Sequence, residues 1–518
     1  MRVLVFTAQT NWRPHYETDL ELIQRHLDEG DEIVHLHCDA DLLACDDNPN
    51  HDMAKRRNCI EIRKTGISLL SRRVPSISFL NLSQTNKQEL ASVQKTFATI
   101  AELKNFSIEE LDIGMAVLSS VISLTRNPEP DVTALSHLIA RFMVAALAVY
   151  RSLQNYLDQN AVDRVYVFNG RYAPVRAVLR ACQSRGVPCY VHERGHDIQH
   201  YAVEKNTTSH DLRHMQQQIR DQWERAVSDP RRNEIAEQFY IERSRGVIQS
   251  WYSFVERQKK DLLPPSWNSR RRNIAIFNSS EDEFAATDAQ WDNPFYTNQL
   301  EGLQRIVRSL EADHDELHCY LRMHPNLNGV DNKHTRELYN LRRDFFEIIP
   351  PDDPVSTYAL IKHADKVLTF GSTVGIEAVF WGTPSILGGR SYYQNLGGTY
   401  NPGSHEELIS MLTADLSPKD RTVALMYGYY FQTFGTPFKY FRATGVVSGE
   451  FKGEVVCPRQ TTLGLWKGRA KTLRRLVATQ PMSAWPSELR RLWVGRKQRL
   501  RFTTGLMRIL RPTKYLQQ

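Results

Sequence analysis

Residues 365–378 have the sequence DKVLTFGSTVGIEA, in which an apolar run passes into a turn rich in glycine and hydroxyl side chains. The apolar residues Val367, Leu368 and Phe370 are typical of a buried strand, and Gly371-Ser372-Thr373 is typical of the turn that starts a helix. The first N–H groups of a helix have no partner within it and attract anions. This stretch therefore predicts either a phosphate-binding site at a helix start or an ordinary strand-to-helix turn with Ser372 as N-cap.

The side chains around this turn suit a nucleotide. Gly371 and Gly375 allow a ligand to approach the backbone closely, and Ser372 and Thr373 can donate to a phosphate oxygen. Glu377 follows within about the first turn of the expected helix, where its carboxylate can accept hydrogen bonds from a pair of ribose hydroxyls.

The rest of the chain alternates strand-like and helix-like segments, which predicts two Rossmann-like α/β domains in tandem. Paired prolines and a basic run mark a linker, after which a fresh strand begins at Asn273. The expected parts are an N-terminal domain at 1–262 with a helical insertion at about 87–160, a linker at 263–272, a C-terminal domain at 273–425, an aromatic-rich return segment at 426–460 and a basic helical tail at 461–518.

Four polar loops follow predicted strands, and we expect them to face one central cleft between the two domains. In the C-terminal domain the loops are 278–282, which contains Ser279 and Ser280, and 322–326. In the latter, His324 can donate to a phosphate oxygen or neutralise a leaving diphosphate, and Pro325 fixes the turn. An isolated His-Pro pair is otherwise typical of a simple turn.

The two N-terminal loops, 168–171 and 192–197, carry candidates for substrate binding and acid–base chemistry. The first offers Asn169, a glycine at Gly170 that lets the chain approach a ligand, and a guanidinium fork at Arg171 for a carboxylate or phosphate. In the second, the carboxylate of Glu193 or Asp197, close to His196 and Arg194, could act as general base for a sugar hydroxyl. The alternative for this second loop is a solvated polar turn.

Together these loops resemble those of the capsule and lipopolysaccharide biosynthesis glycosyltransferases of the GT-B fold, including the capsule-type Kdo transferases. The resemblance covers about residues 160–440 and is carried by 322–325, 354–361, 369–378 and 389–393. It implies a nucleotide-sugar donor, linked to CMP, UDP or GDP, held by Ser279, Ser280, Arg322, His324, Pro325, Gly371, Ser372, Thr373 and Glu377. In the Kdo transferases an acidic-Asp-Gly motif supplies the catalytic carboxylate, whereas the matching position here is Glu193-Arg194-Gly195.

The same resemblance implies a donor site without a metal ion or cofactor. Asp39-x-Asp41 lies in the first domain, away from the predicted donor loops. Cys38, Cys45, His51 and Cys59 could form a zinc site, but their spacing lacks C-x-x-C clips, so scattered buried thiols are the interpretation we favour. Seven widely spaced cysteines indicate a reducing cytoplasm.

The net charge of +7 resides in the tail, because residues 461–518 hold 14 Lys or Arg against one acid, Glu488. Leucine, tryptophan and phenylalanine alternate with these cations, which favours an anionic membrane surface or a docking helix over a nucleic-acid arm. We expect neither a secretory signal nor a membrane span. The expected location is therefore the cytoplasm, peripheral at the inner face of the cytoplasmic membrane, without a nucleic-acid partner.

These observations predict a glycosyltransferase that transfers a sugar from a nucleotide-sugar donor to a growing surface polysaccharide or lipid-linked glycan. One alternative is a UDP-sugar 2-epimerase, a class that carries paired glutamates where this chain has Glu377-Ala378. Another is a non-catalytic scaffold of glycan assembly recruited to the membrane by the tail. The aromatic residues at 427–441 are expected to be interdomain core rather than a sugar platform.

Overall fold

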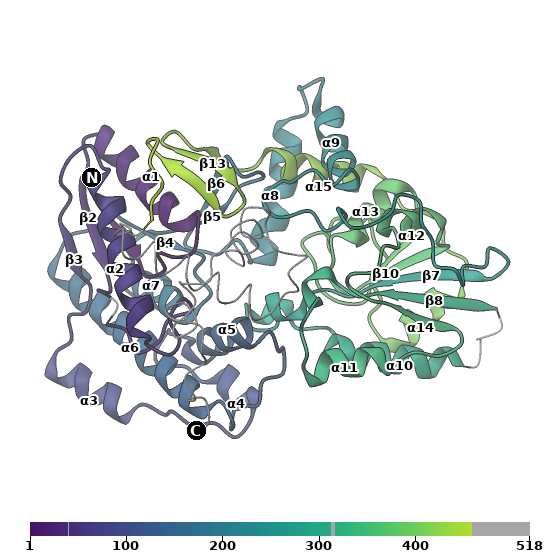
Figure 1. Ribbon diagram of the computed structural model, residues 1–518, viewed down its shortest axis with the longest axis horizontal. Helices are drawn as coiled ribbons and strands as arrows, with labels where there is room; N and C mark the ends of the chain where they lie inside the picture. The colour runs from purple at the N-terminus through teal and green to yellow at the C-terminus, as the bar shows by residue number, and fades with distance from the viewer. Residues whose placement is uncertain (40, 312–315, 458–518) are drawn as a thin grey trace, which may run out of the picture. The chain divides into compact units, whose positions relative to one another are not determined.

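The computed structural model describes residues 1–39, 41–311 and 316–457. Within these ranges the strands form two β-sheets flanked by helices, and one further two-stranded hairpin (Figure 1). The predicted α/β architecture with parallel sheets is therefore confirmed. Residues from Met1 to Cys457 form one compact unit, and the expected boundaries of the linker at 263–272 stay a prediction. The expected basic helical tail lies outside the described residues.

The first sheet has seven strands in the order β12-β6-β5-β4-β1-β2-β3. Its β1 to β5 run parallel, whereas β6 is antiparallel to β5 and β12 is antiparallel to β6. Residues 3–6 of β1, an inner strand of this sheet, are at most 1% exposed, as expected for a parallel strand covered on both faces. The strand bounds are β1 Arg2–Thr7, β2 Glu32–His37, β3 Ser76–Ser78, β4 Arg164–Phe168, β5 Cys189–Arg194, β6 His200–Lys205 and β12 Thr436–Pro437.

The second sheet has five parallel strands in the order β11-β10-β7-β8-β9. The carboxyl ends of β7, β8 and β10 lie side by side, which brings together the loops that follow Phe277, Arg322 and Thr369. The strand bounds are β7 Arg272–Phe277, β8 Leu317–Arg322, β9 Phe346–Ile349, β10 Lys366–Thr369 and β11 Ser385–Leu387.

The helical stretch expected at about 87–160 consists of four helices. The third of these is followed by Arg126 in the left-handed conformation, with φ of 54°, and by prolines at 128 and 130, which cannot continue a helix. The helices of the first half of the chain are α1 His15–Asp28, α2 Met53–Ser68, α3 Gln84–Ser92, α4 Ile100–Asn105, α5 Ile113–Thr125, α6 Ser136–Gln159, α7 Ala173–Ser184, α8 Leu212–Arg225 and α9 Arg232–Ser244.

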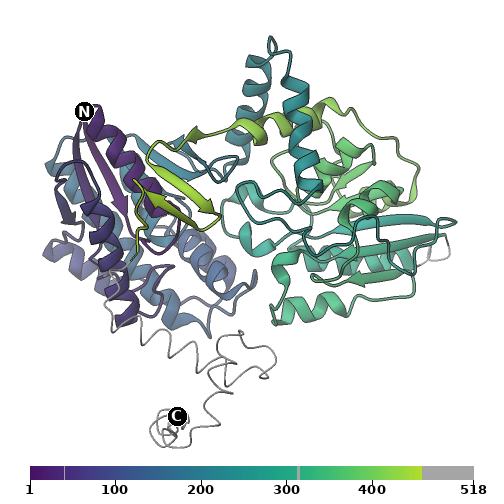
Figure 2. The same cartoon turned by 45° about the horizontal axis from the view of Figure 1, so that its top comes forward.

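The return segment carries the chain from the second sheet back to the first. Helix α15 packs against α9 and α8, β12 then joins the edge of the first sheet, and the hairpin of β13 (Phe441–Gly445) and β14 (Ser448–Phe451) lies against α1 (Figures 1 and 2). Tyr427, Tyr430 and Phe441 are at most 3% exposed, as predicted for core residues. The other aromatics of this segment are half-buried, and an interdomain position of this core stays a prediction. The remaining helices are α10 Gln299–Leu310, α11 Lys333–Tyr339, α12 Thr357–His363, α13 Val374–Trp381, α14 His405–Thr413 and α15 Thr422–Thr433.

Among the helices that the structure describes, none combines the length and the apolar character needed to cross a lipid bilayer.

Candidate active site

Most of the donor-binding residues predicted from the sequence surround one cavity of about 150 Å³ at the carboxyl ends of β7, β8 and β10. Loops that are about 50 residues apart in the chain therefore meet there. The segment between α9 and β7 forms the opposite wall. The predicted residues in the lining are Arg322, His324, Pro325, Ser372, Thr373 and Glu377.

The turn after β10 has the geometry of an anion site. Gly371 has φ of 139°, and a Cβ added there would lie 2.6 Å from the carbonyl oxygen of Arg390, so glycine is required. The Ser372 Oγ accepts from the N–H of Val374 at 3.3 Å, but the N-cap of α13 is Thr373, which makes no side-chain cap hydrogen bond. Within the described part of the chain, the N–H groups of Ser372 and Thr373 make no hydrogen bond. These two donors at the start of α13 are available to a phosphate.

Arg322 is the strongest physical sign of an anionic ligand. It is the last residue of β8, is 3% exposed and donates from Nη2 to the carbonyl oxygen of Asp353 at 3.0 Å. Its Nε and Nη1 have no partner among the described residues. Burial lowers the pKa of Arg322, yet a guanidinium remains charged at neutral pH. A buried cation with unpaired donors is costly unless an anion binds it, and Arg322 lines the cavity.

His324 lines the same cavity as a neutral hydrogen-bond donor. Its Nδ1 accepts from the N–H of Asn326 at 3.2 Å, so the proton of the neutral ring is on Nε2. Burial, helped by the charge of Arg126, lowers the pKa of His324 to about 4. Of the two roles predicted for this residue, donation to a phosphate oxygen fits the neutral ring of the ligand-free protein, and neutralisation of a leaving diphosphate stays a prediction.

His324 is half-buried and shielded from water, and this predicts an acid-sensitive fold. Its pKa is about 4 in the folded protein and about 6.5 in an unfolded chain, so the unfolded state binds the proton first. The stability due to neutral burial is present above pH 6.5 and is lost as the pH falls toward 4. We expect the free energy of unfolding in urea to fall less steeply between pH 7 and 4.5 in His324→Asn than in the wild type. His137 is exposed, so His137→Asn should keep the wild-type dependence of the free energy of unfolding on pH. An equal dependence in all three proteins would contradict the neutral state of His324.

Glu377 is held by protein groups. Its Oε1 lies 3.2 Å from both the Arg243 Nε and the Thr373 Oγ1, and its Oε2 accepts from the Tyr358 hydroxyl. Arg243 also donates to the Thr373 Oγ1 at 3.0 Å. Glu377 is 2% exposed. If it accepts hydrogen bonds from the ribose, as predicted, it must use oxygens that already accept hydrogen bonds from these side chains.

Arg243 and Tyr358 are two residues of this cavity that were not predicted as site residues, although Tyr358 lies in the segment 354–361 that carries the family resemblance. Arg243 is in the last turn of α9, which has no motif that marks it, and Tyr358 starts α12. Burial alone would lower the pKa of Arg243, but the charge of Glu377 raises it overall. The pair therefore fixes the start of α13 against α9 and orients the hydroxyl of Thr373.

We expect Arg243→Met to destabilise the protein by about 3–5 kcal/mol, because it leaves the buried Glu377 carboxylate without its cation. Glu377→Gln should recover much of this loss in the double variant, as measured by urea unfolding of all four proteins in a double-mutant cycle. The matched control is Arg305→Met, which removes a half-exposed ion pair with Glu301 and should cost less than about 1 kcal/mol. Additive effects of the Arg243 and Glu377 changes would show that the pair is not coupled.

The structure places Ser279 and Ser280 away from this cavity. Ser279 donates to the Gln299 side chain at 3.4 Å and lines a second cavity of about 450 Å³, together with Phe370 and Arg390. Ser280 is 1% exposed and donates to Asp282 at 2.6 Å. The residue of this loop that lines the first cavity is Asn278, whose Oδ1 accepts from the N–H of His324 at 2.8 Å. Asn278 was not predicted as a site residue, because the prediction for this loop relied on the hydroxyl groups of its two serines.

The loop expected at 192–197 is partly a strand, which corrects the prediction. Strand β5 continues to Arg194 because its residues pair with β6, with Glu193 opposite Ala202 and Arg194 opposite Tyr201. Polar side chains in this strand project at the carboxyl end of the sheet, so their polarity looked like a loop in the sequence.

Glu193 lies in a polar group at the carboxyl ends of β1, β4 and β5. Its Oε2 accepts from the Asn169 Nδ2 at 2.9 Å, and its Oε1 lies 3.6 Å from the Nε2 of His15. Asn169 has a left-handed φ of 61°, followed by Gly170 at 72°, which turns the amide toward Glu193. Burial lowers the pKa of His15 well below its usual value, so this ring is neutral. His15 was missed, although a histidine that starts the first helix after β1 is a usable signal.

Two arginines predicted for substrate binding already donate hydrogen bonds to protein groups. Arg171 is 6% exposed and donates from Nη2 to the Tyr172 hydroxyl at 2.9 Å and from Nη1 to the Glu283 carbonyl oxygen. Arg194 donates to the carbonyl oxygens of Val446 at 2.7 Å and Arg13 at 3.0 Å. Their guanidinium groups therefore join segments distant in the chain.

His196 and Asp197 lie in the turn between β5 and β6 and do not line the first cavity. The His196 Nδ1 donates to the Phe434 carbonyl oxygen at 2.7 Å, and the Asp197 Oδ1 accepts from the His200 Nδ1 at 2.6 Å. His196, Asp197 and His200 offer ligand atoms within 4.8 Å of one another, so they could hold a cation. Their present hydrogen bonds also suffice to fix the turn against the return segment.

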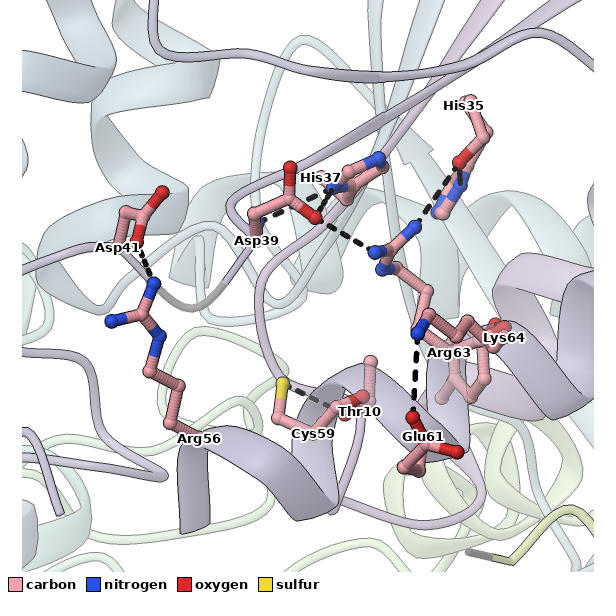
Figure 3. Close-up of polar contacts among 12 residues, drawn as sticks. Thr10, His35, His37, Asp39, Asp41, Arg56, Cys59, Glu61, Arg63 and Lys64 are labelled. Atoms are coloured by element: carbon pink, nitrogen blue, oxygen red, sulfur yellow. Dashed lines mark hydrogen bonds and ion pairs between the residues drawn. The ribbon is translucent and has the colours of Figure 1, made fainter. Parts of the chain in front are cut away.

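Three of the residues considered for zinc, Cys38, Cys45 and Cys59, line one small cavity of about 10 Å³. In the described ranges, the groups close enough to hold a metal contain His, Asp and Glu and no cysteine. The Cys59 sulfur accepts from the Thr10 hydroxyl at 3.0 Å (Figure 3). The same view shows the Asp39 carboxylate turned to His37 and Arg63, at 3.1 and 2.7 Å, and Asp41 paired with Arg56. Both carboxylates are therefore paired with arginines.

Residues 283–428 match the family model of capsule polysaccharide biosynthesis proteins. This confirms the resemblance drawn from the His-Pro and Gly-Ser-Thr motifs for that part of the chain. No curated protein matches the chain in sequence.

Solved structures with a related arrangement come from two kinds of enzyme. One is the KpsC β-Kdo 2,4 transferase of Thermosulfurimonas dismutans, with 12% identity, 52% of this chain and 79% of that chain covered, and a TM-score of 0.35. Another is the UDP-GlcNAc 2-epimerase of Neisseria meningitidis bound to UDP-GlcNAc, with 11% identity, 83% and 97% covered, and a TM-score of 0.26. Because these scores are low, neither structure decides between the two activities.

Proposed function

We propose that this chain, which carries the capsule polysaccharide biosynthesis pattern at 283–428, is a glycosyltransferase of capsule synthesis. It would transfer a sugar from a nucleotide-sugar donor to a growing surface polysaccharide or lipid-linked glycan. The observation that carries the proposal is the buried Arg322, whose Nε and Nη1 lack partners among the described residues, beside the open N–H groups at the start of α13. A site of this kind fits the phosphate of a nucleotide.

The chemistry follows from where charge appears. As the bond between the sugar carbon and the donor phosphate breaks, negative charge grows on the phosphate oxygen that leaves. Arg322, the Nε2–H of His324 and the N–H groups of Ser372 and Thr373 would stabilise that charge. A new bond forms between the sugar carbon and an acceptor hydroxyl, and Glu193 would accept the proton of this hydroxyl. The Asn169 hydrogen bond, at 2.9 Å, orients the Glu193 carboxylate.

No metal ion or cofactor is part of this proposal, because Arg322 and the helix start supply the positive charge that a cation would otherwise provide. The basic segment 461–518 would hold the enzyme at an anionic membrane surface, where a lipid-linked acceptor is found. That placement is peripheral and on the cytoplasmic face.

The test is nucleotide binding followed by sugar transfer. The full chain is screened by thermal shift against CMP, UDP, GDP and their sugar conjugates, and the conjugate that stabilises it is then offered as radiolabelled donor with membrane extract as acceptor. We expect incorporation into glycan that persists in EDTA. Epimerisation of the donor without acceptor would support the 2-epimerase instead, and the absence of both binding and transfer would support a scaffold. If EDTA abolished transfer and His200→Ala had the same effect, a metal would be assigned to the set formed by His196, Asp197 and His200.

A further inference from the structure

We propose that Trp251 and Tyr252 form a stacking platform for the sugar carried by the nucleotide donor, an inference that rests on the proposed function. Of the exposed large hydrophobic side chains among the described residues, four fall within six residues between α9 and β7. Trp251 is 46% exposed and Tyr252 is 48% exposed, and their neighbours Val247 and Ile248 are similar. Exposed apolar side chains that cluster in this way mark binding surfaces.

Both rings line the cavity that contains Arg322, His324 and Ser372. This segment is fixed beside the phosphate-binding residues, because the Phe254 ring meets the His324 ring at 5.3 Å and 68°. The cavity therefore combines anion-binding groups with an aromatic wall. That combination matches a ligand that carries a phosphate and a ring with apolar C–H faces.

The two rings form a corner. Their centroids are 5.5 Å apart and their planes are inclined by 76°, so one ring can support the face of a sugar while the other flanks its edge. The Arg194 guanidinium lies 5.1 Å from the Trp251 ring centroid and donates to the Ser250 carbonyl oxygen at 3.4 Å. Arg194 and Glu193 are consecutive residues of β5, so Trp251 contacts the strand that carries the candidate base. The transferred sugar must lie between the phosphate site and this base.

The alternative occupant is the nucleobase, which also stacks on aromatic rings. The two occupants differ in one measurable respect, because a free nucleotide contains the base but lacks the sugar. Isothermal calorimetry of the full chain with three pairs of probes separates them. The pairs are UDP with UDP-N-acetylglucosamine, CMP with CMP-sialic acid, and GDP with GDP-mannose.

For the pair of probes that binds the wild type, we expect Trp251→Ala to weaken the affinity for the sugar conjugate by about tenfold. Its affinity for the free nucleotide should fall by less than about twofold. Tyr252→Ala should act in the same direction, and Trp251→Phe should restore part of the affinity. Tyr339→Ala is the matched control, since Tyr339 is 42% exposed on α11 and does not line the cavity. Near-UV circular dichroism checks that each variant is folded.

Equal weakening of free nucleotide and conjugate in Trp251→Ala would place the base on the ring and overturn the proposal. Unchanged affinity for both ligands in Trp251→Ala and Tyr252→Ala would overturn it as well. If the wild type binds none of the six probes, the proposed function itself fails and the platform fails with it. Nucleotide binding by the wild type therefore distinguishes a failure of the platform proposal from a failure of the proposed function.

Discussion

Arg322→Met should weaken nucleotide binding by about 100-fold while leaving the protein as stable as the wild type or more stable. The guanidinium is 3% exposed and its Nε and Nη1 lack partners within the described residues, so the native fold already bears the cost of burying it. Methionine is of similar length and removes that cost. A bound phosphate, by contrast, loses two charge-assisted hydrogen bonds, which together contribute about 3 kcal/mol.

The measurement pairs isothermal calorimetry, using the nucleotide that stabilises the wild type, with urea unfolding of the ligand-free proteins. Arg322→Lys should bind nucleotide with intermediate affinity, because it keeps the charge and loses the planar fork. Arg308→Met, an exposed arginine on α10, serves as the control and should bind as the wild type does. If Arg322→Met bound nucleotide normally but unfolded easily, Arg322 would be a structural residue and the donor-site assignment would lose its main support.

The elements that position this site follow from local patterns in the sequence. Strand β7 begins one residue earlier than expected, and α13 follows the Gly-Ser-Thr turn, because buried parallel strands are short apolar runs and glycine marks the turn. His324 and Ser372 meet in one cavity because parallel strands place their carboxyl ends at one edge. These relations need only the identity of neighbouring residues and the direction of the strands.

The partners of the site could not be predicted in this way. Arg243 precedes Thr373 by 130 residues, and its contact depends on how α9 packs against α15 and α13. Glu193 looked like a loop residue because its strand pairing depends on β6, which returns antiparallel after a turn. Trp251 and Tyr252 lie in a segment without regular secondary structure, so no periodicity marked them as part of a cavity.

Glu193→Gln should reduce sugar transfer by about 10²–10⁴-fold while nucleotide affinity stays within about twofold of the wild type. The amide oxygen of glutamine can still accept from the Asn169 Nδ2, which holds Glu193 at 2.9 Å, so the local structure is kept and the proton acceptor is lost. Glu193 is at the carboxyl end of β5 and does not line the phosphate cavity, which is why donor binding should persist.

Transfer rates at saturating donor, compared for Glu193→Gln, Asp197→Asn and His196→Asn, decide which of the three predicted catalytic residues acts as the base. Asp197 is hydrogen-bonded to His200 and His196 to the Phe434 carbonyl, so these two changes should loosen the turn and cost less than about tenfold. The ratio between the transfer rates of the variants is informative because all three residues fall within five consecutive positions, Glu193 at the end of β5 and the other two in the turn that follows. A larger loss in Asp197→Asn than in Glu193→Gln would move the base to Asp197 and leave Glu193 as the residue that orients Asn169.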